Sequence, residues 1–114
     1  MRSILFAALA GAALSVATSL PVRAASFSCM EIESMSPAER KICVSSSLGA
    51  LDERLDSWYR RAQVRAGYFD QTEWLRGEQL RWLASRDACG ASYFCLRRHY
   101  VSRIRALRNY VEHV

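Results

Sequence analysis

Four cysteines constrain this chain more than any other feature, because they lie in a short sequence that follows a predicted export signal. They are Cys29, Cys43, Cys89 and Cys95 in a chain of 114 residues. Four cysteines in a short exported chain are typical of a disulfide framework rather than of a metal or redox site. A small helical domain held together in this way usually presents a surface to a partner and carries out no chemistry.

The N-terminal segment predicts a secretory signal peptide. Arg2 gives a short positive start, residues 4–16 are apolar, and Val22-Arg23-Ala24 places small residues at the spacing that a signal peptidase recognises. The apolar run is too short for a membrane anchor, which needs about 20 apolar residues. We therefore expect a signal peptide over residues 1–24 and a helical domain over residues 25–114. The mature protein is expected to be periplasmic or secreted and not embedded in a membrane.

The charge balance is mildly basic. The chain has 16 basic and 11 acidic side chains, a net charge of +5, and loss of Arg2 and Arg23 with the signal leaves +3. All basic residues except Lys41 are arginines. An exported cationic protein can meet peptidoglycan, lipid phosphates or an acidic cleft on a partner. Nucleic acid is a poor match outside the cytoplasm, so no nucleic-acid partner is expected.

The mature chain predicts an all-α fold, a small disulfide-stapled bundle of three main antiparallel helices plus a short N-terminal turn or helix. Ser36-Pro37-Ala38-Glu39 forms a capping box with proline at the first helical position, and it opens the short piece. The serine run 45–47 caps the first main helix, which is expected to stop at Gly67. The apolar residues of this helix recur at helical spacing; they are Leu48, Leu51, Leu55, Trp58, Tyr59 and Ala62.

Two further helices complete the predicted bundle. Asp70-Gln71-Thr72-Glu73 is expected to cap the second main helix, and Gly90 to end it as the C′ residue. Gly77 costs about 1 kcal/mol relative to alanine inside a helix, so it predicts a close approach by a neighbouring helix. Ser92 caps the third main helix. Because the connections are short, sequential helices should pack antiparallel, and nothing in the sequence predicts a strand.

The four cysteines allow three pairings. We favour Cys29–Cys43, which ties the N-terminal segment to the first helical turn, and Cys89–Cys95, which clamps the turn between the last two helices. A crossed arrangement stays open if both ends of the bundle meet. In the chain-entropy model, closing a loop of the Cys29–Cys43 size is worth about 3 kcal/mol. The chain has no C-x-x-C or C-x-x-C-H motif and only two scattered histidines, so no redox dithiol, haem, metal or other cofactor is expected.

Several polar residues lie on or beside the apolar stripes. They either form a binding site or an interhelical network of hydrogen bonds and ion pairs. We favour the network, since buried charges are tolerated when they are paired. Trp82 and Tyr100 are expected in the core with their polar tips satisfied nearby, and His99 at a surface or half-buried position rather than as a ligand. The four residues of the predicted network are Asp52, Gln79, Arg86 and Arg103.

Two motifs near the cysteines of the last two helices are specific. They are Gln-x-x-Trp-x-x-x-Arg-Asp-x-Cys over residues 79–89 and Cys-Leu-x-x-x-Tyr-x-x-Arg-Ile over residues 95–104. The front half adds Cys29, Ser36-Pro37, Glu39, Ile42-Cys43, Leu51-Asp52, Leu55 and Tyr59. With these residues, from about Cys29 to Leu107, the chain resembles the LprI-like lysozyme inhibitor family. The resemblance implies a small exported helical domain that inhibits lysozyme and is not an enzyme.

Lysozyme is therefore the expected protein partner, and charged residues are the candidate contacts. A glycosidase of this kind holds two carboxylates in its cleft, and an arginine such as Arg97 or Arg98 can pair with one of them. The second candidate is the loop that carries Glu31 and Glu33. Family members usually have a small residue and a lysine just after the first cysteine, whereas Met30-Glu31-Ile32-Glu33 stands here.

A second interpretation is a non-enzymatic cell-envelope interaction module. It would bind another envelope protein or an anionic polymer through the arginine-rich outer face of the last helix. Typical host lysozymes are themselves cationic, which disfavours long-range attraction between the two proteins. An enzyme is the weakest interpretation, because the chain has no G-x-S-x-G motif, no metal-ligand cluster and no free cysteine if both bridges form.

Overall fold

The computed structural model describes residues 23–24 and 27–113. The predicted signal peptide lies outside the described residues except for its last two positions, so that prediction stays untested. The elements in chain order are β1 (Arg23–Ala24), β2 (Phe27–Ser28), the 3₁₀ turn η1 (Ile32–Ser34), α1 (Pro37–Val44), α2 (Ser46–Tyr68), α3 (Thr72–Asp87) and α4 (Tyr93–Glu112).

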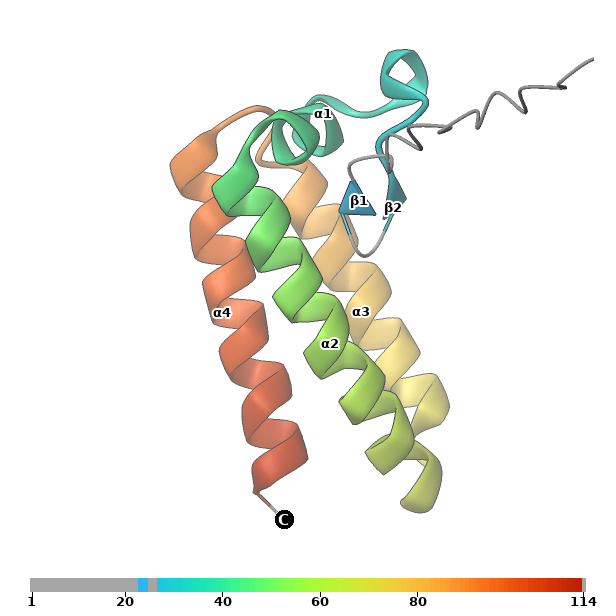
Figure 1. Ribbon diagram of the computed structural model, residues 1–114. Helices are drawn as coiled ribbons and strands as arrows, with labels where there is room; N and C mark the ends of the chain where they lie inside the picture. The colour runs from blue at the N-terminus through green and yellow to red at the C-terminus, as the bar shows by residue number, and fades with distance from the viewer. Residues whose placement is uncertain (1–22, 25–26, 114) are drawn as a thin grey trace, which may run out of the picture.

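The three long helices form a bundle, and the short helix α1 lies across one end of it (Figure 1). α3 runs antiparallel to α2, and α4 turns back to run antiparallel to α3 (Figure 1). The all-α prediction of three main helices and a short N-terminal helix is confirmed. None of the described helices has the length and apolar character needed to cross a membrane.

One small departure is a strand pair that the sequence analysis did not expect. β1 and β2 pair antiparallel, with Arg23 opposite Ser28 and Ala24 opposite Phe27. A ladder of two residues on each side is too short to show the alternating pattern that predicts a strand. The predicted signal-peptide boundary falls between β1 and β2, so cleavage after Ala24 would remove one side of this ladder.

The predicted helix starts at the serine caps are confirmed. The Ser36 hydroxyl accepts from the Glu39 N–H at 3.2 Å, and the Ser36 N–H donates to the Glu39 carboxylate at 3.1 Å. Pro37 occupies the first helical position. Ser45 and Ser92 cap α2 and α4, each accepting from the backbone N–H three residues further on. These side chains satisfy N–H groups that have no partner inside the helix.

The predicted boundary between the first and second main helices is wrong. α2 continues through Gly67 to Tyr68, and Asp70 adopts the left-handed conformation with a φ of 57°. The Gln71 N–H then donates to the Ala66 carbonyl at 2.8 Å, the bond of a Schellman motif. Asp70 therefore closes the helix before it instead of capping the helix after it, and Gln71 stands at the start of α3 without a side-chain cap.

Two glycine predictions also change. Among the described residues, a Cβ at Gly77 would lie near only the Arg81 guanidinium of the same helix, at 3.8 Å from its nearest nitrogen. None of the described neighbouring helices approaches there, so that prediction is wrong. Gly90 does adopt a left-handed φ of 58°, as a helix stop requires. However, α3 ends at Asp87 and Ala88 is its C-cap, so Cys89 is the C′ residue and Gly90 lies one residue further on than predicted.

The core lies mainly where α4 packs along α2, with α1 closing its end. Trp82 is partly buried, and its indole N–H donates to the His99 carbonyl at 3.2 Å. Disulfides join Cys29 to Cys43 and Cys89 to Cys95, so the sequential pairing is confirmed. The buried apolar residues are Ala38, Ile42, Leu48, Leu55, Ala62, Ala66, Leu75, Leu96, Tyr100 and Leu107.

Candidate functional site

A polar cluster lies inside the core, where α2, α3 and α4 meet. Asp52 and Tyr100 are fully buried, and the Tyr100 hydroxyl donates to an Asp52 carboxylate oxygen at 2.7 Å. Arg86 is 3 % exposed and donates to the Tyr100 hydroxyl at 3.4 Å. Its guanidinium lies 4.0 Å from the same Asp52 oxygen. One residue from each long helix thus joins a single charge-assisted chain of contacts.

The environment of this cluster shifts two of its pKa values. Burial, followed by the Asp52 charge, raises the pKa of Tyr100 well above its usual value, so this tyrosine stays protonated. Burial alone would lower the pKa of Arg86, but contacts with Tyr100 and Asp87 outweigh burial and raise it. The Arg86 guanidinium also lies over the rings of Phe27 and Trp82, 5.2 and 5.7 Å from their centroids. These contacts hold a fixed positive charge inside the bundle.

The other two residues of the predicted network form a separate pair nearer the surface. The Arg103 side chain donates to the Gln79 amide oxygen at 3.0 Å. One terminal nitrogen of Arg103 is buried and has no hydrogen-bond partner among the described atoms. Burial lowers the pKa of Arg103, and the nearby Glu78 charge opposes that shift. The structure therefore brings Asp52 together with Arg86 and Gln79 together with Arg103. Their structural role stays a prediction.

An open groove between α3 and α4 is a feature that the sequence analysis missed. It has a volume of about 580 Å³ and places Arg81, Arg98 and Arg103 along its walls. Ser85 and Ser102 also line it. Glu78 lies in the groove as well and pairs with Arg81, so part of the positive charge is already compensated. Hydroxyl and guanidinium donors together make this groove suitable for an anionic group.

The two arginines predicted as contacts do not share this groove. Arg98 lines it, whereas Arg97 lines a smaller groove between α2 and α4, next to Arg54 and Tyr93. Adjacent helical residues point in directions about 100° apart, which explains the separation. Both arginines are exposed and lie in the first turns of α4, just after Cys95.

Glu31 and Glu33 lie at the same end of the bundle, on the segment that precedes α1. Both are exposed, and the apolar residues between and before them are also exposed, Met30 by 73 % and Ile32 by 43 %. A shallow, mostly apolar groove begins at Ile32 and continues to Val44 on α1, and Arg40 and Lys41 also line it. The segment therefore presents acidic and apolar side chains together, unlike the arginine-lined groove between α3 and α4.

Together these features define a small disulfide-stapled helical domain with a buried polar cluster that contains one residue from each of the three long helices. The model of the family described as "Lysozyme inhibitor LprI" matches residues 29–107. The chain therefore belongs to the LprI lysozyme inhibitor family, a family of inhibitors rather than of enzymes. No curated protein and no solved structure gives a significant match.

Proposed function

We propose that this protein is an exported inhibitor that binds lysozyme and blocks hydrolysis of peptidoglycan. The observation that carries the proposal is the family match, which extends from Cys29 to Leu107 and so includes both disulfides and most of α4. A periplasmic or secreted location is part of the proposal. It is supported by two disulfides, which persist in oxidising compartments.

The proposed contact is an exposed arginine at the start of α4. Cys95 is fixed to Cys89 by a disulfide, and Ser92 caps the helix, so the backbone that carries Arg97 and Arg98 is held before any partner arrives. Fixing a contact in advance reduces the ordering cost of binding. An arginine presented in this way can pair with a carboxylate in the sugar-binding cleft and exclude the substrate.

Clearing of a bacterial cell-wall suspension by lysozyme tests this proposal. The oxidised mature protein, residues 25–114, is expected to abolish activity near a one-to-one ratio. Charge reversal by Arg97→Glu with Arg98→Glu should weaken inhibition at least about thirtyfold, because losing one partner of a buried charge pair costs about 2–5 kcal/mol. The Glu31→Lys and Glu33→Lys pair tests the second candidate surface in the same assay.

A matched control is Arg76→Glu with Arg105→Glu, which makes the same charge change at exposed positions on α3 and α4. It should leave inhibition unchanged. If the wild-type protein inhibits but Arg97→Glu with Arg98→Glu inhibits equally well, the arginine contact is wrong. If the wild type fails at large excess against several classes of lysozyme, the inhibitor function itself is wrong.

The groove between α3 and α4 favours a second candidate function, a cell-envelope module that binds an anionic polymer. Arg81 and Arg103 line that groove and are not part of the proposed lysozyme contact, whereas Arg98 belongs to both surfaces. Binding to a polyanion weakens steeply as salt rises, because exposed charges are screened beyond about 8 Å at physiological ionic strength. Stoichiometric inhibition that persists at moderate salt separates the lysozyme inhibitor from this alternative.

A further inference from the structure

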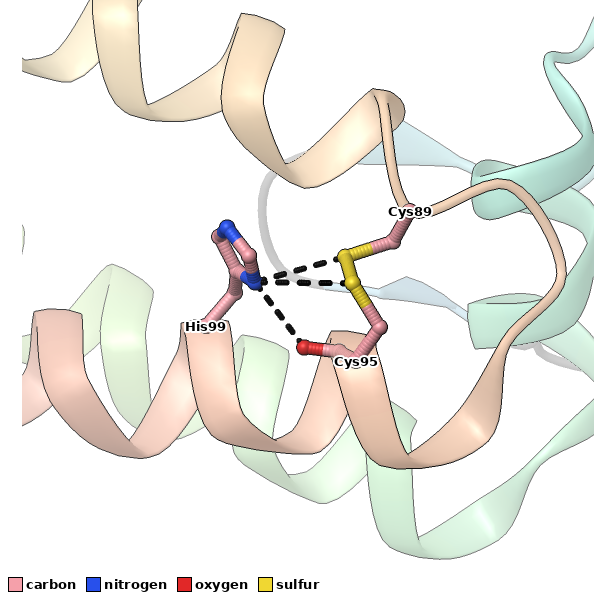
Figure 2. Close-up of side chains that lie close together, drawn as sticks. All are labelled: Cys89, Cys95 and His99. Atoms are coloured by element: carbon pink, nitrogen blue, oxygen red, sulfur yellow. Dashed lines mark hydrogen bonds between the residues drawn. A yellow bond between two sulfur atoms is a disulfide. The ribbon is translucent and has the colours of Figure 1, made fainter.

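The disulfide between α3 and α4 has an imidazole directly beside it. His99 Nδ1 lies 3.3 Å from the Cys89 sulfur and 3.8 Å from the Cys95 sulfur (Figure 2). The three potential ligand atoms all lie within 4.8 Å of one another, and each of the residues is half-buried. Cys95 and His99 are four residues apart on α4, so they share one helix face, and Cys89 reaches them from the end of α3.

The hydrogen bonds of His99 fix where its ring points. Nδ1 lies 2.9 Å from the Cys95 carbonyl oxygen, to which it donates, and Nε2 lies 2.8 Å from the Ser85 hydroxyl, from which it accepts. The ring is therefore held from both sides, with Nδ1 facing the two sulfurs. A serine hydroxyl can donate or accept, so the proton can move to Nε2, where the Ser85 hydroxyl then accepts it. That move ends the Nδ1–H bond to the Cys95 carbonyl and leaves the Nδ1 lone pair available to a metal ion.

We propose that reduction of the Cys89–Cys95 disulfide creates a binding site for Zn²⁺, with the two thiolates and His99 Nδ1 as ligands. In the oxidised protein the sulfurs are bonded to each other and the site is closed. A thiol reductant supplies two electrons and two protons, which break the S–S bond and give two thiols, while the reductant becomes its own disulfide. Zn²⁺ then replaces the two thiol protons, and the imidazole proton moves from Nδ1 to Nε2.

The distances fit a tetrahedral zinc ion. Zn–S bonds of about 2.3 Å and Zn–N bonds of about 2.0 Å at tetrahedral angles place sulfur and nitrogen about 3.5 Å apart. The two observed sulfur–nitrogen distances, 3.3 and 3.8 Å, lie on either side of that value. The sulfurs themselves must separate to about 3.8 Å. Rotation of the two cysteine side chains provides this, since their Cα atoms are already 5.6 Å apart.

The surroundings supply the remaining parts of a zinc site. Ser85 would accept the Nε2–H of a zinc-bound His99, the kind of outer contact that orients a metal-binding imidazole. Ser85 and His99 both line the open groove between α3 and α4. Because all three candidate ligand residues are only half-buried, a water molecule could complete the fourth coordination position, and the site would have three protein ligands and one exchangeable one.

The second disulfide provides a comparison within the same molecule. The Cys43 sulfur lies 3.8 Å from the Met35 thioether sulfur. Among the described residues, the Cys29–Cys43 pair belongs to no group of three histidine, cysteine or acidic ligands. Reduction of this pair should give a dithiol without an imidazole ligand and hence a much weaker zinc site.

The first test measures thiol redox equilibrium in the folded mature protein. The protein is equilibrated in a glutathione buffer with and without Zn²⁺, free thiols are trapped by alkylation, and each cysteine is quantified by peptide mass. Zn²⁺ should raise the ratio of reduced to oxidised Cys89–Cys95 while leaving Cys29–Cys43 nearly unchanged. His99→Ala should reduce the effect of Zn²⁺ on this ratio by about tenfold or more. Loss of a residue that merely contacts a zinc ligand already weakens metal affinity by about 10–100-fold, and His99 is proposed as a ligand itself.

The second test uses Co²⁺ as a spectroscopic probe on protein that has been reduced and freed of reductant under argon. Thiolate-to-cobalt absorption should appear in the wild type, disappear in Cys89→Ser with Cys95→Ser, and weaken and shift in His99→Ala. The oxidised protein should show no such absorption. Equal effects of Zn²⁺ on both cysteine pairs, or a cobalt spectrum and affinity unchanged by His99→Ala, would overturn the proposal.

Discussion

At the residue scale, the most consequential group is the buried chain of Asp52, Tyr100 and Arg86. Each residue comes from a different long helix, and the contacts among them are 2.7–4.0 Å long. Burying charges is costly unless they are paired and hydrogen-bonded. The cluster therefore favours one arrangement of the three helices over arrangements that would leave a charge unpaired.

Replacing Arg86 by methionine tests this role. Arg86→Met removes the positive charge next to the fully buried Asp52, so the free energy of unfolding should fall by about 3–5 kcal/mol, measured by urea denaturation. Arg76→Met on the same helix is the control, because Arg76 is exposed and should change stability by less than about 0.5 kcal/mol. Equal effects of the two substitutions would show that the buried cluster contributes little.

The raised pKa of Tyr100 predicts how the free energy of unfolding responds to alkaline pH. Its pKa is raised in the folded protein above the ordinary value of 10.0. Below pH 10 the tyrosine keeps its proton in both the folded and the unfolded state, so its contribution to the free energy of unfolding does not change with pH. Above pH 10 the unfolded state loses the proton first, and the unfolding free energy should fall by about 1.4 kcal/mol per pH unit. Guanidinium unfolding from pH 9 to 11.5 should show this slope in the wild type and a shallower one in Tyr100→Phe.

At the element scale, helix starts follow from local sequence more closely than helix ends. The caps at Ser36, Ser45 and Ser92 depend on a hydroxyl and a backbone N–H three residues apart, which the sequence displays directly. Asp70 was misassigned because an aspartate before Thr72-Glu73 has the pattern of a cap. The loop between α2 and α3 is so short that the same residue must close the preceding helix in a left-handed conformation.

The Asp70 assignment leads to a stability prediction. If Asp70 were an N-cap, its replacement by glycine would lower the free energy of unfolding by only a few tenths of a kcal/mol. At a positive φ, glycine avoids the steric cost that other residues have there. Asp70→Gly should therefore raise the free energy of unfolding by about 0.5–1 kcal/mol. Asp70→Val should lower it, because a β-branched residue tolerates this conformation poorly. Urea denaturation of both variants decides between the two assignments.

At the scale of the whole molecule, the sequence predicts the fold class, the helix order and the disulfide pairing, but not the groove. Arg81 and Ser85 on α3, and Arg98 and Ser102 on α4, each have the four-residue spacing of a common helix face. That spacing was visible in the sequence. Which two faces meet depends on how each helix rotates against the core, and packing across all three helices sets that rotation. For the same reason Tyr100 was expected in the core but not as the link between Asp52 and Arg86.

The two disulfides should contribute unequally to the stability of the whole molecule. Cys29–Cys43 spans a sequence separation of 14, and Cys89–Cys95 spans only 6. The longer loop restricts the unfolded chain more, so its removal should cost about 3 kcal/mol against about 2.4 kcal/mol for the shorter one. Cys29→Ser with Cys43→Ser also releases the segment that precedes α1, whereas Cys89→Ser with Cys95→Ser loosens a turn already held by the Ser92 cap.

Guanidinium unfolding of the two double variants under identical oxidising conditions measures this difference. We expect the variant without Cys29–Cys43 to have the lower midpoint, and both variants to keep the helical circular dichroism signal of the wild type before unfolding. The opposite order of midpoints would mean that native-state contacts around the α3–α4 turn, including those of His99, stabilise the protein more than the extra restriction of the unfolded chain by the longer loop. In that case the turn, rather than the N-terminal segment, would be the main covalent support of the bundle.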